Sequence, residues 1–284
     1  MKYTTLVSVG DLAAHLDDPD WIVCDCRHDL VNTGAGRDAY AQAHIPGARF
    51  VHVDGDLSAP LTGRNGRHPL PDPAKFVARL GALGIDNAKQ VVAYDATGGI
   101  YAARLWWMLR WVGHDAAAVL DGGWDAWTRA GQRVAAQPPT VTPARFVPRH
   151  RVDFMRDAAA VAVAAHDKKL SLLLDARSPD RFRGENETLD PVAGHIPGAL
   201  NRFFRLNLDA DGRFKPAATL REEFEAALGA ASPSDVVHYC GSGVTACHNL
   251  LAMEIAGLGG SRLYPGSWSE WVADRARPVA TGDP

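Results

Sequence analysis

The amino-acid sequence predicts an α/β protein with two domains, each a central parallel β-sheet flanked by helices on both faces. The chain has 284 residues, enough for two domains of common size. Blocks of sequence recur in the same order in its two halves. Short apolar runs such as Gln90–Tyr94 and Val236–Tyr239 alternate with helical patterns. Because these runs are apolar without alternation, we expect strands that are covered on both faces, as in parallel sheets.

The internal repeat fixes the domain count. Four blocks of the first half recur in the second half at a nearly constant offset. The pairs are Asp25-Cys26-Arg27 with Asp175-Ala176-Arg177, His44-Ile45-Pro46-Gly47 with His195-Ile196-Pro197-Gly198, Val91-Val92-Ala93-Tyr94-Asp95 with Val236-Val237-His238-Tyr239-Cys240, and Gly122-Gly123-Trp124 with Gly266-Ser267-Trp268. Duplication of one domain explains this order better than chance. The Asp-x-Arg block recurs in both copies, so we expect structural ion pairs there.

A proline-rich stretch separates the two copies. Prolines lack a backbone donor and favour extended chain, and three of them lie between Gln137 and Pro143. We therefore expect a first domain over residues 1–137, a linker over 138–149 and a second domain over 150–284.

Composition excludes several classes of protein. The formal net charge of −3 gives no basic surface for nucleic acid. The longest apolar run, Tyr101–Val112, is interrupted by arginines and is shorter than the roughly 20 residues that span a bilayer. We expect no membrane association, a cytoplasmic location and reduced cysteines. The spacing of those cysteines does not suit zinc, and no motif indicates a cofactor, so neither a metal nor a cofactor is expected.

The candidate nucleophile is Cys240. It follows an apolar strand and precedes a helical pattern, Val244–Ile255, through the loop Cys240-Gly241-Ser242-Gly243-Val244-Thr245. Glycines let a loop curl so that its amides turn inward, and amides at a helix N-terminus stabilise an anion. We therefore expect Gly241, Gly243, Val244 and Thr245 to surround a reactive thiolate or its persulfide.

Three other loop chemistries do not fit these residues. The loop lacks the lysine of a phosphate-binding Walker loop. Ala246 stands where a cysteine phosphatase would carry its phosphate-binding arginine. Cys240 and Val244 flank Ser242 where a hydrolase elbow would have glycines. Sulfur chemistry remains.

Taken together, these motifs resemble the tandem rhodanese-domain proteins over nearly the whole chain, and the loop resembles that of the mercaptopyruvate sulfurtransferases. The resemblance implies a catalytic second domain and an inactive first one, in agreement with Asp95 at the position that corresponds to Cys240. It also implies transfer of sulfur from 3-mercaptopyruvate through a Cys240 persulfide to a thiol such as thioredoxin, or to cyanide, with release of pyruvate. Thiosulfate-specific relatives tend to carry basic residues after the cysteine, whereas this loop has Gly241 and Ser242.

The resemblance also implies a set of site residues. A loop serine works with a histidine and an aspartate of the first domain, and by motif match these are Ser242, His44 and Asp38. Arginines before the second His-Ile-Pro-Gly hold the donor, and Arg181 and Arg183 match the first of them. A second arginine, common a few residues before that histidine, is missing from the stretch that begins at Thr188.

Two other functions stay open on the sequence. The first keeps the fold and the nucleophile but uses thiosulfate as the donor. The second is a non-catalytic carrier or binding module that receives sulfur only from a partner protein. The physiological acceptor, the oligomeric state and the pathway do not follow from the residues.

Overall fold

The computed structural model describes residues 2–166 and 171–284, and its contacts divide the chain into two compact units. Unit 1 contains residues up to Ala59 together with Pro71–Arg151 and Ala210–Phe214. Unit 2 contains Pro60–Leu70, Val152–Asp209 and Lys215–Pro284.

Two short segments belong to the unit built mainly by the other half of the sequence. In unit 2, the backbone N–H of Arg67 donates to Ser269 Oγ at 3.0 Å. In unit 1, the N–H of Phe214 donates to Asp121 Oδ1 at 2.9 Å. The predicted linker, 138–149, lies within unit 1. The predicted boundaries describe contiguous stretches of chain, whereas the compact units are discontinuous.

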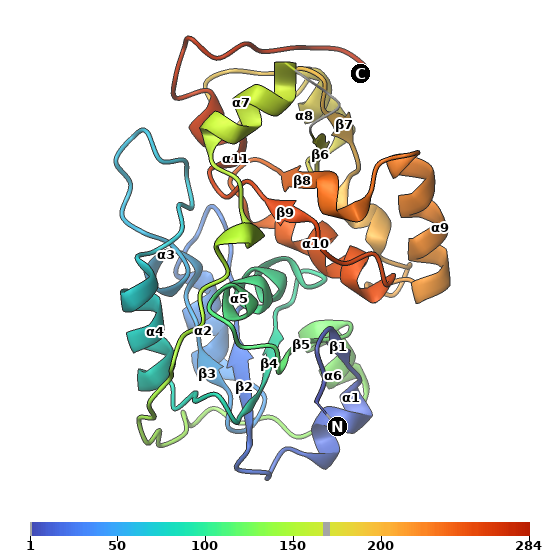
Figure 1. Ribbon diagram of the computed structural model, residues 1–284. Helices are drawn as coiled ribbons and strands as arrows, with labels where there is room; N and C mark the ends of the chain where they lie inside the picture. The colour runs from blue at the N-terminus through green and yellow to red at the C-terminus, as the bar shows by residue number, and fades with distance from the viewer. Residues whose placement is uncertain (1, 167–170) are drawn as a thin grey trace. The chain divides into compact units, whose positions relative to one another are not determined.

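Unit 1 is a parallel sheet with strand order β1-β5-β4-β2-β3. Its core cluster joins Leu12 of α1, Tyr40 of α2 and Trp127 of α6 to strand residues such as Val23 and Val92. Helix α5 contacts β4 and β5 (Figure 1). Its elements are β1 Leu6–Val7, α1 Val9–Ala14, β2 Trp21–Asp25, α2 Ala35–Gln42, β3 Arg49–Phe50, α3 Val53–Asp56, α4 Pro73–Ala82, β4 Gln90–Tyr94, α5 Ile100–Trp111, β5 Ala117–Leu120 and α6 Gly123–Arg129.

Unit 2 repeats this plan with the strand order β7-β6-β8-β9. Figure 1 shows α7 and α11 on one side of this sheet and α9 and α10 on the other. Its elements are the 3₁₀ turn η1 Val152–Phe154, α7 Ala158–His166, β6 Leu172–Asp175, α8 Pro179–Arg183, β7 Leu200–Asn201, η2 Phe204–Asn207, α9 Ala217–Leu228, η3 Pro233–Asp235, β8 Val236–Tyr239, α10 Thr245–Ile255, β9 Arg262–Leu263 and α11 Ser267–Trp271.

The predicted fold class is confirmed, and the repeat extends to side-chain contacts. In unit 1 the hydroxyl of Tyr94 accepts from the N–H of Ile45 at 3.2 Å, and in unit 2 Tyr239 accepts from Ile196 at 3.3 Å. The expected ion pairs are also present: Arg27 Nη2 and Arg177 Nη2 each lie 2.7 Å from a buried carboxylate, Asp25 and Asp175 respectively. Each ion pair holds the start of the loop that follows a strand, β2 in unit 1 and β6 in unit 2.

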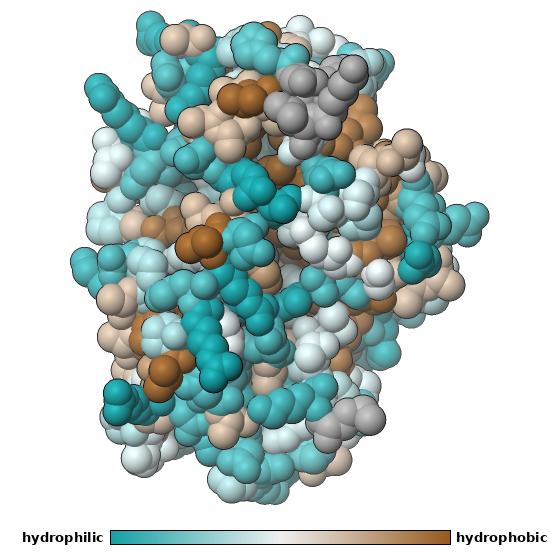
Figure 2. All heavy atoms as spheres, viewed as in Figure 1, coloured by the Kyte–Doolittle hydropathy of each residue, from teal (hydrophilic) through white to brown (hydrophobic). Residues whose placement is uncertain are grey.

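The large apolar side chains lie mostly inside the two cores. On the face in Figure 2, hydrophilic side chains predominate and hydrophobic ones form small groups. Over the residues described, no helix combines the length and apolarity needed to cross a membrane.

The topology positions the reactive loop. β8 is flanked by β6 and β9, and it ends at Tyr239, so Cys240 lies directly at the carboxyl end of a strand inside the sheet. Helix α10 begins at Thr245, close to the predicted start at Val244. In parallel α/β sheets this edge is where ligands bind.

Candidate active site

The loop between β8 and α10 folds around the sulfur of Cys240. The N–H of Gly243 donates to Cys240 Sγ at 3.1 Å, so at least one loop amide faces the thiol. Gly243 has φ of +78°, and a methyl group on it would clash with the backbone oxygen of Pro265. Only glycine fits this turn without strain. The Cys240 side chain is buried.

The start of α11 fixes the other side of the loop. The backbone oxygens of Cys240 and Gly241 accept from the amides of Trp268 and Ser269, both at 2.9 Å. The N–H of Cys240 donates to Ser267 Oγ at 3.1 Å. Ser267 is buried and has φ of +54°, an uncommon conformation for a residue with a side chain. These bonds hold Cys240 in one place.

The corresponding loop of unit 1 shows what such a turn binds. Asp95 follows β4 as Cys240 follows β8, and its carboxylate is fully buried. Oδ1 accepts from the amides of Thr97 and Gly99 at 2.8 and 2.9 Å, and Oδ2 accepts from those of Tyr101 and Ala102 at 2.8 and 3.0 Å. In unit 1 the turn therefore binds an anion that belongs to the chain itself.

Ser242 lies beside a histidine that the sequence analysis did not single out. His68 Nδ1 is 2.7 Å from Ser242 Oγ, and both side chains are buried. His68 belongs to the Pro60–Leu70 segment of unit 2. Although 174 positions separate the two residues, the contact lies within one compact unit. A hydroxyl and an imidazole at this distance can share a proton.

His44 and Asp38, the residues expected to work with Ser242, belong to unit 1. The ring of His44 stacks on Tyr40 with centroids 4.0 Å apart, and its Nδ1 is 2.7 Å from the Tyr40 carbonyl oxygen. His195 makes the same contacts with Phe182, at 3.8 and 2.8 Å. Asp38 is exposed on α2. Both histidines of the repeated motif thus pack in the same way.

Arg181 and Arg183, the predicted donor-binding residues, lie in different surroundings. A methyl group built on Gly241 would lie 3.5 and 3.7 Å from the two terminal nitrogens of Arg181, which places this guanidinium over the loop. Arg183 instead makes two hydrogen bonds to the exposed Glu185, at 2.8 and 2.7 Å. Of the two, the structure brings Arg181 to the reactive loop.

A second guanidinium lies over the same loop. Nη2 of Arg67 is 2.7 Å from the position of that built methyl group, closer than Arg181. Arg67 was not predicted as a site residue. Two buried carboxylates hold both arginines: Arg67 pairs with Asp190, and Arg181 Nη2 lies 2.8 Å from Glu187. Burial raises the pKa of Asp190 and Arg67 opposes that shift, because a nearby cation favours the charged carboxylate.

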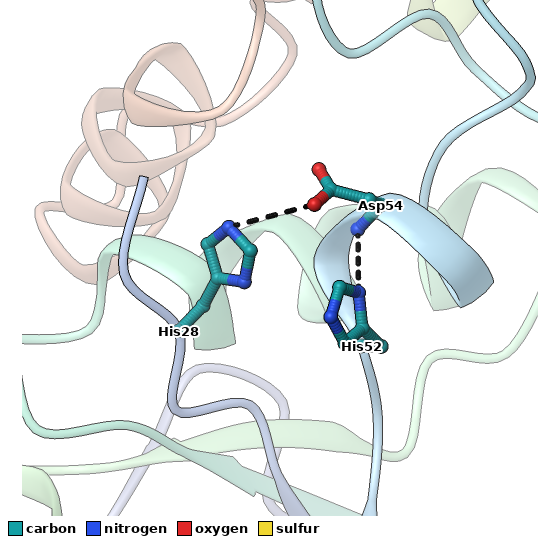
Figure 3. Close-up of side chains that lie close together, drawn as sticks. All are labelled: His28, His52 and Asp54. Carbon is teal, nitrogen blue, oxygen red and sulfur yellow. Dashed lines mark hydrogen bonds and ion pairs between the residues drawn. The ribbon is translucent and has the colours of Figure 1, made fainter. Parts of the chain in front are cut away.

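A cluster in unit 1 has the composition of a metal site but not its bonding. His28, His52 and Asp54 lie close together, with His28 Nε2 3.9 Å from Asp54 Oδ2 (Figure 3). His52 Nδ1 accepts from the amides of Asp54 and Gly55, and its Nε2 faces the Thr33 carbonyl at 3.0 Å. Since one nitrogen already accepts and the other must donate, His52 has no lone pair left for a cation. These bonds cap α3.

Comparisons with known proteins agree with this geometry. The model of the rhodanese-like domain matches residues 8–130 and 158–274. Over 285 residues the chain is 47% identical to a protein of Pseudomonas aeruginosa named "Probable 3-mercaptopyruvate sulfurtransferase", with all of both chains covered. It is 34% identical to the thiosulfate sulfurtransferase of Bos taurus, covering 97% of this chain and 94% of the relative.

A solved structure gives the same result. The crystal structure of SseA from Escherichia coli, described as a 3-mercaptopyruvate sulfotransferase with the "rhodanese" fold, superposes with a TM-score of 0.81. The two chains are 30% identical, and the match covers 94% of this chain and 99% of that one. With a domain match in each half and relatives aligned from end to end, the chain belongs to the rhodanese-like family.

Proposed function

We propose that the chain is a sulfurtransferase that takes sulfur from 3-mercaptopyruvate onto Cys240 and passes it to a thiol such as thioredoxin, or to cyanide. The observation that carries this proposal is the bond from the Gly243 amide to Cys240 Sγ, in a loop whose counterpart in unit 1 binds a carboxylate. The names of full-length relatives support the same activity and donor.

The first half-reaction needs a thiolate and a stabilised leaving group. The Cys240 thiolate attacks the sulfur of the donor, a sulfur–sulfur bond forms, and the carbon–sulfur bond breaks. Its electron pair stays on carbon as the enolate of pyruvate, which takes up one proton. The persulfide on Cys240 remains in the loop, where the Gly243 amide faces the sulfur and stabilises its negative charge, as four amides stabilise that of Asp95. An acceptor thiolate then attacks the outer sulfur and Cys240 leaves as a thiolate.

His68 and Ser242 are the groups that we assign to the proton. With Ser242 Oγ 2.7 Å from His68 Nδ1, the hydroxyl can donate to the developing enolate while the imidazole replaces the proton. We assign this role to His68 in place of His44, whose Nδ1 faces a backbone carbonyl in unit 1. Arg181 is assigned to the donor's carboxylate because its guanidinium lies beside Gly241.

Thiosulfate is a second candidate donor, and a specific observation favours it. The loop residues after Cys240 are neutral, but Arg67 and Arg181 bring two guanidinium groups beside Gly241. The electrostatic surroundings of the loop are therefore less neutral than its own sequence indicates. With thiosulfate, Cys240 would attack the outer sulfur and sulfite would leave.

Steady-state kinetics with both donors and cyanide as the acceptor test this proposal. We expect ping-pong kinetics, a higher kcat/KM with 3-mercaptopyruvate, and no turnover by Cys240→Ala. Cys26→Ala is the matched control, because Cys26 is also buried and unit 2 has Ala176 at the equivalent position. Turnover by Cys240→Ala would refute the mechanism. No wild-type turnover with either donor would favour a non-catalytic carrier.

A further inference from the structure

We infer that Arg67 supplies the second guanidinium of the carboxylate-binding site, in place of the arginine that is missing before the second His-Ile-Pro-Gly motif. This inference rests on the proposed function and names one more of its residues. The stretch from Thr188 to Val192 contains no arginine. The cation reaches the site instead from the Pro60–Leu70 segment, which precedes α4 in sequence but belongs to unit 2.

The position of Arg67 is the first argument. Its Nη2 is 2.7 Å from where a methyl group on Gly241 would stand, and the nearest nitrogen of Arg181 is 3.5 Å from the same point. Gly241 directly follows the nucleophile. Two guanidinium groups beside one glycine can bind the two oxygens of a carboxylate, with the donor's sulfur two carbons further along, near Cys240.

Two carboxylates orient the guanidinium groups of Arg67 and Arg181 and leave some of their N–H groups directed toward Gly241. Asp190 Oδ1 pairs with Arg67 Nη1, while Glu187 takes Nε and Nη2 of Arg181 at 3.1 and 2.8 Å. Both carboxylates are only 2% exposed, so water replaces these bonds poorly. Arg67 Nη2 and Arg181 Nη1 are not engaged by these acids, and both lie within 3.7 Å of the point beside Gly241.

The backbone beneath Arg67 is fixed as well. The N–H of Arg67 donates to Ser269 Oγ at 3.0 Å, and Gly66, with φ of +80°, packs closely on the backbone oxygen of Gly266. Ser269 in turn donates its own N–H to the oxygen of Gly241. Ser269 therefore connects the backbone of Arg67 to the backbone of the loop that follows Cys240. Such preorganisation lowers the entropy lost when a ligand binds.

Alkylation of Cys240 tests this inference without any turnover. Iodoacetate carries a carboxylate and iodoacetamide does not, so the ratio of their rates reports on anion binding beside the thiol. We expect Arg67→Met to lower the iodoacetate rate relative to the iodoacetamide rate by about tenfold or more, the usual effect of losing a hydrogen bond to a charged group. Arg67→Lys should keep part of the preference.

Arg64→Met is the matched control, because Arg64 lies in the same segment and is exposed. It should leave the ratio unchanged. If Arg67→Met slowed both reagents equally, Arg67 would only support the loop or His68, and the inference would be overturned. A ratio that falls in Arg67→Met while the wild type turns over neither donor would support the carboxylate site and refute the proposed function.

Donor kinetics separate a carboxylate site from a general anion site. We expect Arg67→Met to raise the KM for 3-mercaptopyruvate about tenfold, with a smaller change in kcat, because the lost contact is made in both the ground state and the transition state. The effect on thiosulfate should be weaker, because its oxygens lie closer to the attacked sulfur than a carboxylate does and match the spacing of this subsite less well. An equal loss with both donors would overturn the assignment to the carboxylate.

Discussion

Removing the carboxylate of Asp95 tests whether the turn is built to bind an anion. Four backbone amides donate to this buried side chain at 2.8–3.0 Å, with a fifth, longer bond from Thr97 Oγ1 at 3.3 Å. Asp95→Ala leaves four N–H groups without their acceptor, three of them in buried hydrogen bonds. A bond to a charged group contributes roughly 1.5–3 kcal/mol, and an unpaired buried group costs roughly 1–3 kcal/mol.

The loss in stability is smaller than the sum of these contributions, because water molecules and relaxation of the loop compensate for part of it. We therefore expect Asp95→Ala to lower the free energy of unfolding of unit 1 by about 3–5 kcal/mol, as when one partner of a buried ionic contact is removed. Asp95→Asn should cost less, since its amide oxygen still accepts while its NH₂ group meets two amides head on.

Urea unfolding followed by tryptophan fluorescence measures this loss. Six of the eight tryptophans lie in unit 1, so the transition of that unit dominates the signal. Asp17→Asn is the control, because the Asp17 side chain is 90% exposed, and it should change stability by less than about 0.5 kcal/mol. An Asp95→Ala protein as stable as the control would refute the view that this turn binds and needs an anion.

Three further predictions concern buried histidines and the loop of Cys240. Burial lowers the pKa of His238 to about 3, so from pH 6.5 downward the unfolded chain binds a proton that the folded chain excludes, and stability falls. At pH 5 this amounts to about 2 kcal/mol, and His238→Phe should remove that part of the pH dependence of urea unfolding. His68→Gln should lower kcat/KM for 3-mercaptopyruvate by about 10²–10⁴-fold, whereas His44→Gln should change stability with little effect on the kinetics of folded protein, and the reverse pattern would restore the original assignment. Gly243→Ala should lower the alkylation rate of the Cys240 thiol, because the added methyl group would clash with the Pro265 oxygen and displace the loop. An unchanged alkylation rate would contradict the loop geometry.

Much of the fold follows from sequence because its determinants are local. The runs Gln90–Tyr94 and Val236–Tyr239 form β4 and β8 as predicted, and the helical pattern Val244–Ile255 corresponds to α10. Most of the side chains that these segments bury are apolar, with polar exceptions such as Gln90 and His238. The internal repeat predicted that both halves of the chain form the same kind of parallel sheet, and the two sheets in the structure are both parallel.

The candidate site was less predictable because two of its residues reach it through long-range contacts. His68 and Arg67 stand in Thr62-Gly63-Arg64-Asn65-Gly66-Arg67-His68-Pro69, a polar turn sequence without helical or strand periodicity. Their contacts with Ser242 and Ser269 span 174 and 202 positions. No local pattern encodes such pairing.

The repeat bears on the role predicted for His44. Its motif recurs at His195 in the second half, and two copies of one motif in two copies of one domain are expected to do the same thing. Both rings stack on an aromatic neighbour and bond a backbone carbonyl. His68 has no counterpart in the repeat and is therefore a second candidate for a role confined to one site, while the role of His44 stays a prediction.

The central claim is that Cys240 carries the transferred sulfur. Intact-protein and peptide mass spectrometry after mixing the purified chain with 3-mercaptopyruvate, with no acceptor present, tests it most directly. The account predicts a gain of one sulfur atom on the peptide that contains Cys240, and loss of that gain when cyanide is added. An unmodified Cys240 in protein that releases pyruvate, or sulfur found on Cys247 instead, would contradict it.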